Sequence, residues 1–205
     1  MLSLEEKLNT LSHAMGVLFG SIGLFYLLQE NSVATPYATL SIWVYSGCFV
    51  ILFMASTAYH LVTDVDLKRK LRVFDHISIY MLIAGTYTPV ALIALEDSKG
   101  WPLFYSVWGL TAIGTFFKLF FTGKYEWLSL LLYLLMGWLI IVDFTSLYAA
   151  ISDLGLLLLF LGGMFYTVGI VFYAIHKIPY NHFIWHLFVL AGAVSHWFFI
   201  CNDII

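Results

Sequence analysis

The last apolar stretch of the chain contains three histidines, at positions 182, 186 and 196. His182 and His186 are four residues apart, so on a helix their rings lie one above the other on the same face and could hold a single ion. Imidazoles are costly inside an apolar segment, and they indicate a functional site when a partner can be named. These partners must come from other parts of the chain.

Three polar residues elsewhere are the candidate partners. His60 lies near the end of an apolar run, Ser56 lies one helical turn before it, and Asp75 follows the charged stretch 64–72. Three neutral imidazoles around zinc leave a fourth position for water, which is a frequent catalytic arrangement. In this interpretation Asp75 is the general base or holds that water, and Ser56 hydrogen-bonds the water or a developing oxyanion.

The spacing alone leaves simpler interpretations open. The histidines could be interfacial residues bonded to lipid headgroups or to backbone. Asp75 could be a cap or first-turn acid that favours the helix dipole, and Ser56 could be a small packing residue. His196 lies roughly 21 Å beyond His182 along a helix, so it cannot bind the same ion. The roles of His196, Asp143, His13 and His76 stay open.

The composition predicts an integral membrane protein. Of the 205 residues, 62% are hydrophobic and 10% are charged, and the mean hydropathy of +0.93 lies outside the range of soluble domains. The net charge is -3 and there is no basic tract, so we expect membrane lipids rather than nucleic acid as partners. Cys48 and Cys201 fit apolar packing and give no disulfide framework.

The hydrophobic pattern predicts one all-α domain, a bundle of seven transmembrane helices over residues 1–205. Each span needs roughly 20 apolar residues, and short charged connections separate the runs. Nothing in the pattern predicts an oligomeric state. The expected helices cover residues 11–28, 38–62, 75–95, 101–121, 127–149, 154–174 and 182–200.

The distribution of lysine and arginine predicts the orientation. With a cytoplasmic N-terminus, eight of the nine basic residues lie on the cytoplasmic side and Lys99 alone lies outside. The C-terminus is then extracytoplasmic. The same topology brings His60, Asp75, His182 and His186 to the cytoplasmic half of the membrane.

These residues resemble the hemolysin III family, which belongs with the progestin and adipoQ receptors and, more distantly, the alkaline ceramidases. The resemblance covers essentially the whole chain. It implies a seven-helix bundle with zinc bound by His60, His182 and His186, and with Asp75 reaching the zinc-bound water. The motifs are Glu6-x-x-Asn9-x-x-x-His13, Ser56-x-x-x-His60, Asp75, Gly85-Thr86-Tyr87-Thr88-Pro89, and His182-x-x-x-His186 followed by His196.

Three functions follow as hypotheses. The first is a zinc-dependent hydrolase that cleaves an amide or ester in a membrane lipid and releases a fatty acid. The second is a receptor-like regulator of membrane fluidity with structural zinc and no turnover. The third is a pore-forming cytolysin, which the few charges in the helices disfavour because channels need polar lining rings. The short loops and the resemblance predict the bacterial inner membrane as the location.

Overall fold

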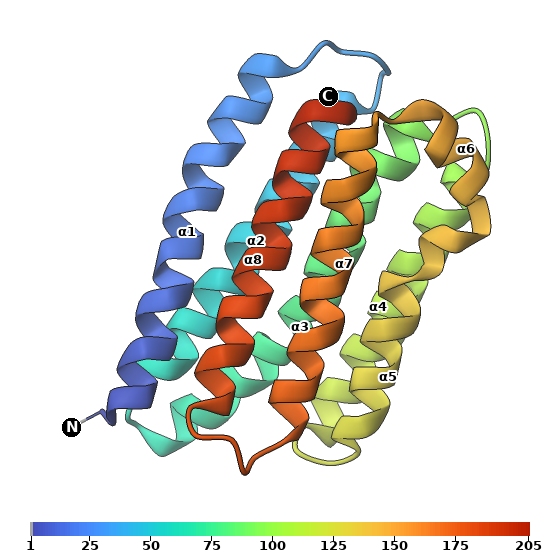
Figure 1. The fold of residues 1–205 in the computed structure, drawn as a ribbon. Coiled ribbons are helices and arrows are strands. Elements are labelled where there is room, and N and C mark those ends of the chain that lie inside the picture. Colours follow the sequence, from blue (N-terminus) through green and yellow to red (C-terminus); the bar gives the residue numbers. More distant parts are fainter. Residues whose placement is uncertain (1) are drawn as a thin grey trace.

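The computed structural model describes residues 2–205, and within this range seven helical spans are long and apolar enough to cross a membrane. They stand side by side as one bundle, with the two ends of the chain at opposite ends of it (Figure 1). Large apolar side chains such as Leu18, Phe116 and Leu157 are exposed around its circumference, as expected for a surface that faces lipid. The predicted fold class is confirmed.

The helices differ from the predicted ranges mainly at their ends. The first begins at Leu4, where the Ser3 hydroxyl accepts a hydrogen bond from the Glu6 backbone N–H at 3.2 Å. The elements are α1 (Leu4–Glu30), α2 (Ala38–Leu61), α3 (Val65–Pro89), η1 (Val90–Ala94), α4 (Gly100–Phe121), α5 (Glu126–Gly137), η2 (Leu139–Asp143), α6 (Phe144–Ala150), α7 (Asp153–Ala174) and α8 (Asn181–Asp203).

The expected start of the third helix at Asp75 was ten residues too late. The Asp64 carboxylate caps α3 by accepting a hydrogen bond from the Leu67 N–H at 2.8 Å, so the charged stretch that hydropathy marked as a loop is helical. Charged residues are good helix formers, and the hydropathy pattern detects only the apolar part of a helix. Asp75 therefore lies well inside α3, and the interpretation of Asp75 as a helix cap is wrong.

The predicted fifth span consists of three consecutive helical segments, α5, η2 and α6. A short 3₁₀ segment, η2, separates α5 from α6, and a break in a membrane helix leaves backbone groups that need partners. The Tyr87 hydroxyl is the partner of two of these backbone groups: it donates to the Gly137 carbonyl at 3.0 Å and accepts from the Ile140 N–H at 2.8 Å. Two residues further along, α3 ends at Pro89, which has no N–H to donate. A π-helical turn, η1, follows it.

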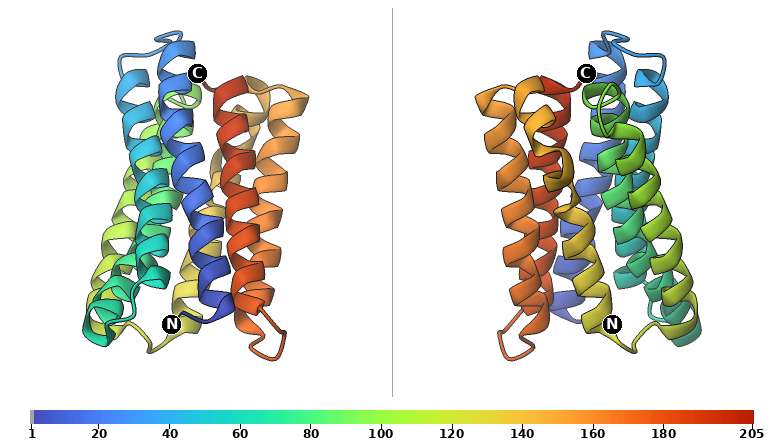
Figure 2. Two further views of the ribbon diagram at one scale, coloured as in Figure 1. Left: turned by 90° about the vertical axis from the view of Figure 1, so that its left-hand side faces the viewer. Right: turned by 90° about the vertical axis from the view of Figure 1, so that its right-hand side faces the viewer.

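The connections between α2 and α3, α4 and α5, and α7 and α8 lie at the same end of the bundle as the N-terminus (Figure 2). The α2–α3 connection is only residues 62–64, so the end of α2 and the start of α3 are held close together. Eight of the nine basic residues belong to elements at this end, and Lys99 belongs to the other. The positive-inside rule assigns the N-terminal end to the cytoplasm, and this orientation stays a prediction.

Helix α1 packs closely against α2 and α8 because glycines face its neighbours. A Cβ atom on Gly16 would lie 2.3 Å from a ring carbon of Phe53, and one on Gly20 would lie 2.4 Å from a ring carbon of Phe49. Small residues allow membrane helices to approach at such distances. This packing holds the N-terminal turns of α1 against the ends of α2 and α8.

We expect Gly16→Ala to destabilise the bundle by roughly 1–3 kcal/mol, because the new methyl group overlaps the Phe53 ring. The matched control is Gly47→Ala on α2, where a Cβ would meet no neighbouring atom within 4 Å among residues 2–205. The control should be neutral or slightly stabilising, since alanine favours a helix more than glycine does. Thermal unfolding in detergent micelles measures both, and equal Tm values would contradict the prediction.

Candidate metal centre

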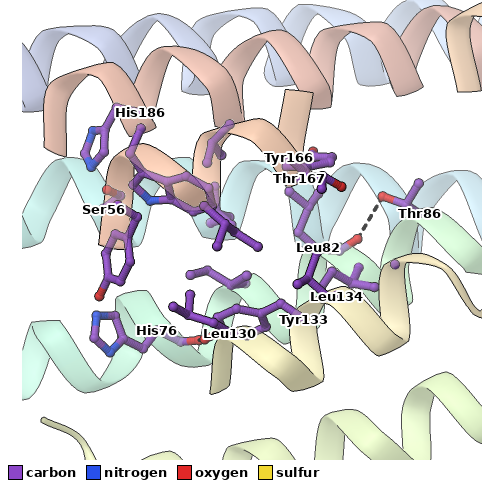
Figure 3. Close-up of a pocket in the computed structure, with 18 of the residues that line it drawn as sticks. Ser56, His76, Leu82, Thr86, Leu130, Tyr133, Leu134, Tyr166, Thr167 and His186 are labelled. Carbon is purple, nitrogen blue, oxygen red and sulfur yellow. Dashed lines mark hydrogen bonds between the residues drawn. The ribbon is translucent and has the colours of Figure 1, made fainter. Parts of the chain in front are cut away.

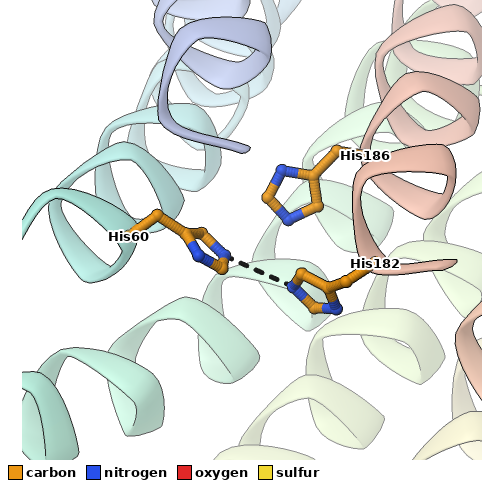
Figure 4. Close-up of side chains that lie close together, drawn as sticks. All are labelled: His60, His182 and His186. Atoms are coloured by element: carbon orange, nitrogen blue, oxygen red, sulfur yellow. Dashed lines mark hydrogen bonds between the residues drawn. The ribbon is translucent and has the colours of Figure 1, made fainter. Parts of the chain in front are cut away.

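Three imidazoles meet at the N-terminal end of the bundle, one from α2 and two from α8 (Figure 4). His60 lies in the last turn of α2, and His182 and His186 lie in the first two turns of α8, one above the other. One ring nitrogen from each histidine lies within 4.8 Å of the other two. His60 is 3% exposed and His186 2%, so the structure brings together in its interior the three residues proposed as ligands.

One nitrogen–nitrogen distance in this histidine cluster matches that expected for a tetrahedral zinc site. Two nitrogen ligands that each lie about 2.0–2.1 Å from zinc are about 3.3 Å apart across a tetrahedral site. The Nε2 atoms of His60 and His182 are 3.3 Å apart. The donor set is also suitable, because imidazole nitrogen is a preferred ligand of zinc and of several other transition metals.

The opposite nitrogens of two rings have partners on α1. His60 Nδ1 lies 2.6 Å from a carboxylate oxygen of Glu6, and His186 Nδ1 lies 3.4 Å from the backbone carbonyl of Asn9. Both partners accept hydrogen bonds, so each ring carries its proton on Nδ1 and keeps the Nε2 lone pair free for an ion. Two of the three imidazoles thus have Nε2 available for a cation, and His182 brings its own Nε2 to 3.3 Å from that of His60.

His13 covers the cluster from α1. Its ring stacks on that of His186 with centroids 3.7 Å apart and planes 12° apart. Within residues 2–205, neither ring nitrogen of His13 has a hydrogen-bond partner, and the side chain is 3% exposed. His13 therefore packs over one of the proposed ligands.

Ser56 and Asp75 face the same region from α2 and α3. Both line a cavity that also includes His182 and His186, as Figure 3 shows for Ser56 and His186. Ser56 is 1% exposed, and among residues 2–205 its hydroxyl has no hydrogen-bond partner. A carboxylate and a hydroxyl therefore line the same cavity as two of the three imidazoles, where they can bind a proton and donate a hydrogen bond.

The cavity runs from the histidine cluster toward the opposite end of the bundle. It encloses about 1170 Å³, part of it open to the surroundings, between α3, α5, α7 and α8. The apolar side chains along its middle are Ile79, Leu82, Ile83, Leu130, Leu134, Ile170 and Val189. Figure 3 shows Leu82, Leu130 and Leu134 between the end with Ser56 and His186 and the end with Tyr166 and Thr86.

The residues whose roles the sequence left open lie at different places in the fold. His196 lines the far part of the cavity, away from the histidine cluster, where its Nε2 lies 3.1 Å from the Leu159 carbonyl. Asp143 holds η2 to the α3–α4 connection by accepting from the Ser98 hydroxyl at 2.6 Å and the Lys99 N–H at 2.9 Å. His76 also lines the cavity, with Nδ1 3.9 Å from Glu126.

The contacts of Glu6 and Asn9 with the histidine rings were missed in the sequence analysis. Both residues were part of the motif at the start of α1, but hydropathy began that helix at residue 11 and gave them no position. A signal was present: Glu6, Asn9 and His13 are spaced three and four residues apart, so they share one face of a helix that starts at Leu4. That face is the one turned toward the histidine cluster.

Comparison with known proteins places the chain in a family. The sequence model for proteins described as haemolysin-III related matches residues 2–197. The chain belongs to this family. As a haemolysin III-related protein with seven apolar spans and relatives in Bacillus, it is an integral membrane protein of the bacterial plasma membrane.

The haemolysin III relatives match over nearly their full lengths. The "Hemolysin-3 homolog" of Bacillus subtilis (strain 168) is 40% identical over 195 residues, covering 95% of this chain and 92% of the relative. "Hemolysin-3" of Bacillus cereus is 38% identical over 195 residues, which cover 95% of this chain and 89% of the relative. The human "Monocyte to macrophage differentiation factor" is 29% identical over 204 residues, covering 95% and 82%. No solved structure gives a significant match.

We expect His60→Ala to abolish tight binding of a divalent metal, because two imidazoles on one helix remain and their partner from α2 is lost. The purified wild type should contain about one metal ion per chain, measured by elemental analysis after dialysis. His176→Ala, in the exposed α7–α8 connection, is the control and should retain the metal. A His60→Ala protein with wild-type metal content would contradict the assignment of His60 as a ligand.

Proposed function

We propose that the protein is a zinc-dependent hydrolase that cleaves an amide or ester bond in a membrane lipid. The observation that carries this proposal is that His182 and His186, two of the three clustered imidazoles, line a largely apolar cavity together with Asp75 and Ser56. The zinc, the reaction and the lipid are all parts of the proposal. The histidine cluster, the cavity and the family membership support it.

Each side chain at this end has a distinct task in the proposal. A zinc ion held by the histidines would act as a Lewis acid and lower the pKa of a bound water to about 7. The Asp75 carboxylate accepts the proton of the attacking water and later donates it to the leaving amine or alcohol. The Ser56 hydroxyl, which lacks another partner within residues 2–205, donates a hydrogen bond to the oxyanion that forms on the carbonyl.

The shape of the cavity favours a lipid substrate. An acyl chain would lie along the apolar middle, which excludes water, while its carbonyl lies at the polar end. A second groove between η2 and α7 shares Gly137, Trp138, Gly163 and His196 with the cavity. This groove lies on the lipid-facing side of the bundle, so it supports a route by which a chain reaches the cavity sideways from the membrane.

The same lining disfavours a pore. A conducting path needs rings of polar groups along its length, whereas leucine, isoleucine and valine side chains interrupt the polar groups that line this cavity. The regulator with structural zinc differs from the hydrolase only in lacking turnover. Measurements on Asp75 and on the cavity therefore separate these two functions.

We expect Asp75→Asn to lower kcat by about 10²–10⁴-fold while the metal content and the Tm remain near those of the wild type, because the amide cannot accept the proton. The assay measures fatty acid released in nanodiscs from a panel of N-acyl and O-acyl lipids, with and without a zinc chelator. Asp66→Asn, in the exposed first turn of α3, is the control. A fully zinc-loaded wild type that hydrolyses no member of the panel would leave the regulator as the function.

We expect Ile83→Trp to reduce hydrolysis of long-chain substrates more than that of short-chain substrates, because the larger side chain fills the middle of the cavity. The measurement is kcat/KM against acyl length from about 6 to about 18 carbons, a range set by the roughly 21 Å between the His182 and His196 levels. Ile113→Trp, on the exposed face of α4, controls for added bulk. A uniform loss at all chain lengths would argue against binding of the acyl chain in this cavity.

A further inference from the structure

The first two turns of α1 lie against the histidine cluster, on the side away from the cavity. The Ser3 cap fixes where the helix starts, and Glu6 and Asn9 then follow on one face. We propose that Glu6 is a positioning residue that orients the His60 ring and strengthens it as a metal ligand. The inference rests on the metal centre of the proposed function and is independent of turnover.

The distances show which group engages His60 Nδ1. The Glu6 carboxylate lies 2.6 Å from this nitrogen, and the side-chain amide of Asn9 lies 3.5 Å from it. The two contacts require opposite tautomers, since a carboxylate accepts a proton from Nδ1 whereas the amide N–H donates to it. The shorter, charge-assisted contact prevails, so His60 carries its proton on Nδ1 and offers Nε2 to an ion.

The second carboxylate oxygen holds Glu6 in place. It lies 2.8 Å from the Lys68 ammonium, which belongs to the first turns of α3. The Lys68 ammonium also lies 5.0 Å from the centre of the Tyr59 ring, next to His60 in sequence. Glu6 is thus fixed at both oxygens, and its side chain connects α1, α2 and α3 at the metal centre.

This arrangement has a chemical consequence that an ordinary ion pair lacks. A carboxylate hydrogen-bonded to the far nitrogen of an imidazole fixes the ring plane and increases the basicity of the nitrogen that binds the metal. A pair between Glu6 and Lys68 alone would be partly exposed and contribute little. The 2.6 Å contact with a ring that is 3% exposed therefore assigns Glu6 to the histidine cluster.

We expect Glu6→Ala to weaken metal binding by about 10–100-fold, because His60 loses both its orientation and its charged partner. Glu6→Gln should weaken it less, since the amide oxygen still accepts the Nδ1 proton but carries no charge. Competition with a chelator of known affinity measures both variants, with zinc as the probe. The visible spectrum of the Co²⁺-loaded protein should shift in Glu6→Ala, because the ligand geometry changes.

Glu5→Gln is the matched control, because it removes a neighbouring carboxylate that makes no contact with the histidine rings among residues 2–205. It should keep wild-type affinity and spectrum. Wild-type metal affinity and an unchanged Co²⁺ spectrum in Glu6→Ala would overturn the inference while the metal centre stands. If Glu6→Ala does not fold, wild-type metal affinity together with an unchanged Co²⁺ spectrum in both Glu6→Gln and Lys68→Met overturns the inference. A wild type that binds no zinc overturns both this inference and the proposed function.

Discussion

The structure depends on a cluster of three imidazoles between α2 and α8, of which His60 and His186 are buried and His182 is partly buried. Each neutral ring has polar nitrogens that must find partners in a region from which water is largely excluded, and an unpaired polar group in an apolar environment costs several kcal/mol, about 2–7 by common scales. The partners of His60 Nδ1 and His186 Nδ1 come from α1, through Glu6 and the Asn9 carbonyl. This requirement ties α8 to α1 and α2, which are distant from it in sequence.

The close packing of α1 serves the same requirement. Glycines on α1 allow the Phe49 and Phe53 rings of α2 to lie against its backbone, so the helix approaches near enough for Glu6 to reach His60. Without that approach the carboxylate could not lie 2.6 Å from the ring. The apolar packing in the middle of the membrane and the polar contacts at its edge are therefore parts of one arrangement.

Much of the fold and of the histidine cluster could be predicted from the sequence. The lengths of the apolar runs predicted seven spans. The known rise of a helix fixes how deep each residue lies in the membrane, so His60 was predicted at the same depth as His182 and His186, which share one helix face. Charged helical turns were beyond the reach of hydropathy, so Asp75 was misplaced at a helix start. The contact between Glu6 and His60 depends on how two helices are rotated, and a single sequence does not specify this.

The break in the fifth span affects how that span can move. Asp143 fixes η2 to the α3–α4 connection, whereas the junction between α5 and η2 is held through the Gly137 carbonyl and the Ile140 N–H, both bonded to the Tyr87 hydroxyl. A helix bends most easily where its regular hydrogen-bond ladder is interrupted. The part of the fifth span that bends most easily therefore lies beside the cavity, where Gly137 and Trp138 at the end of α5 belong to its lining.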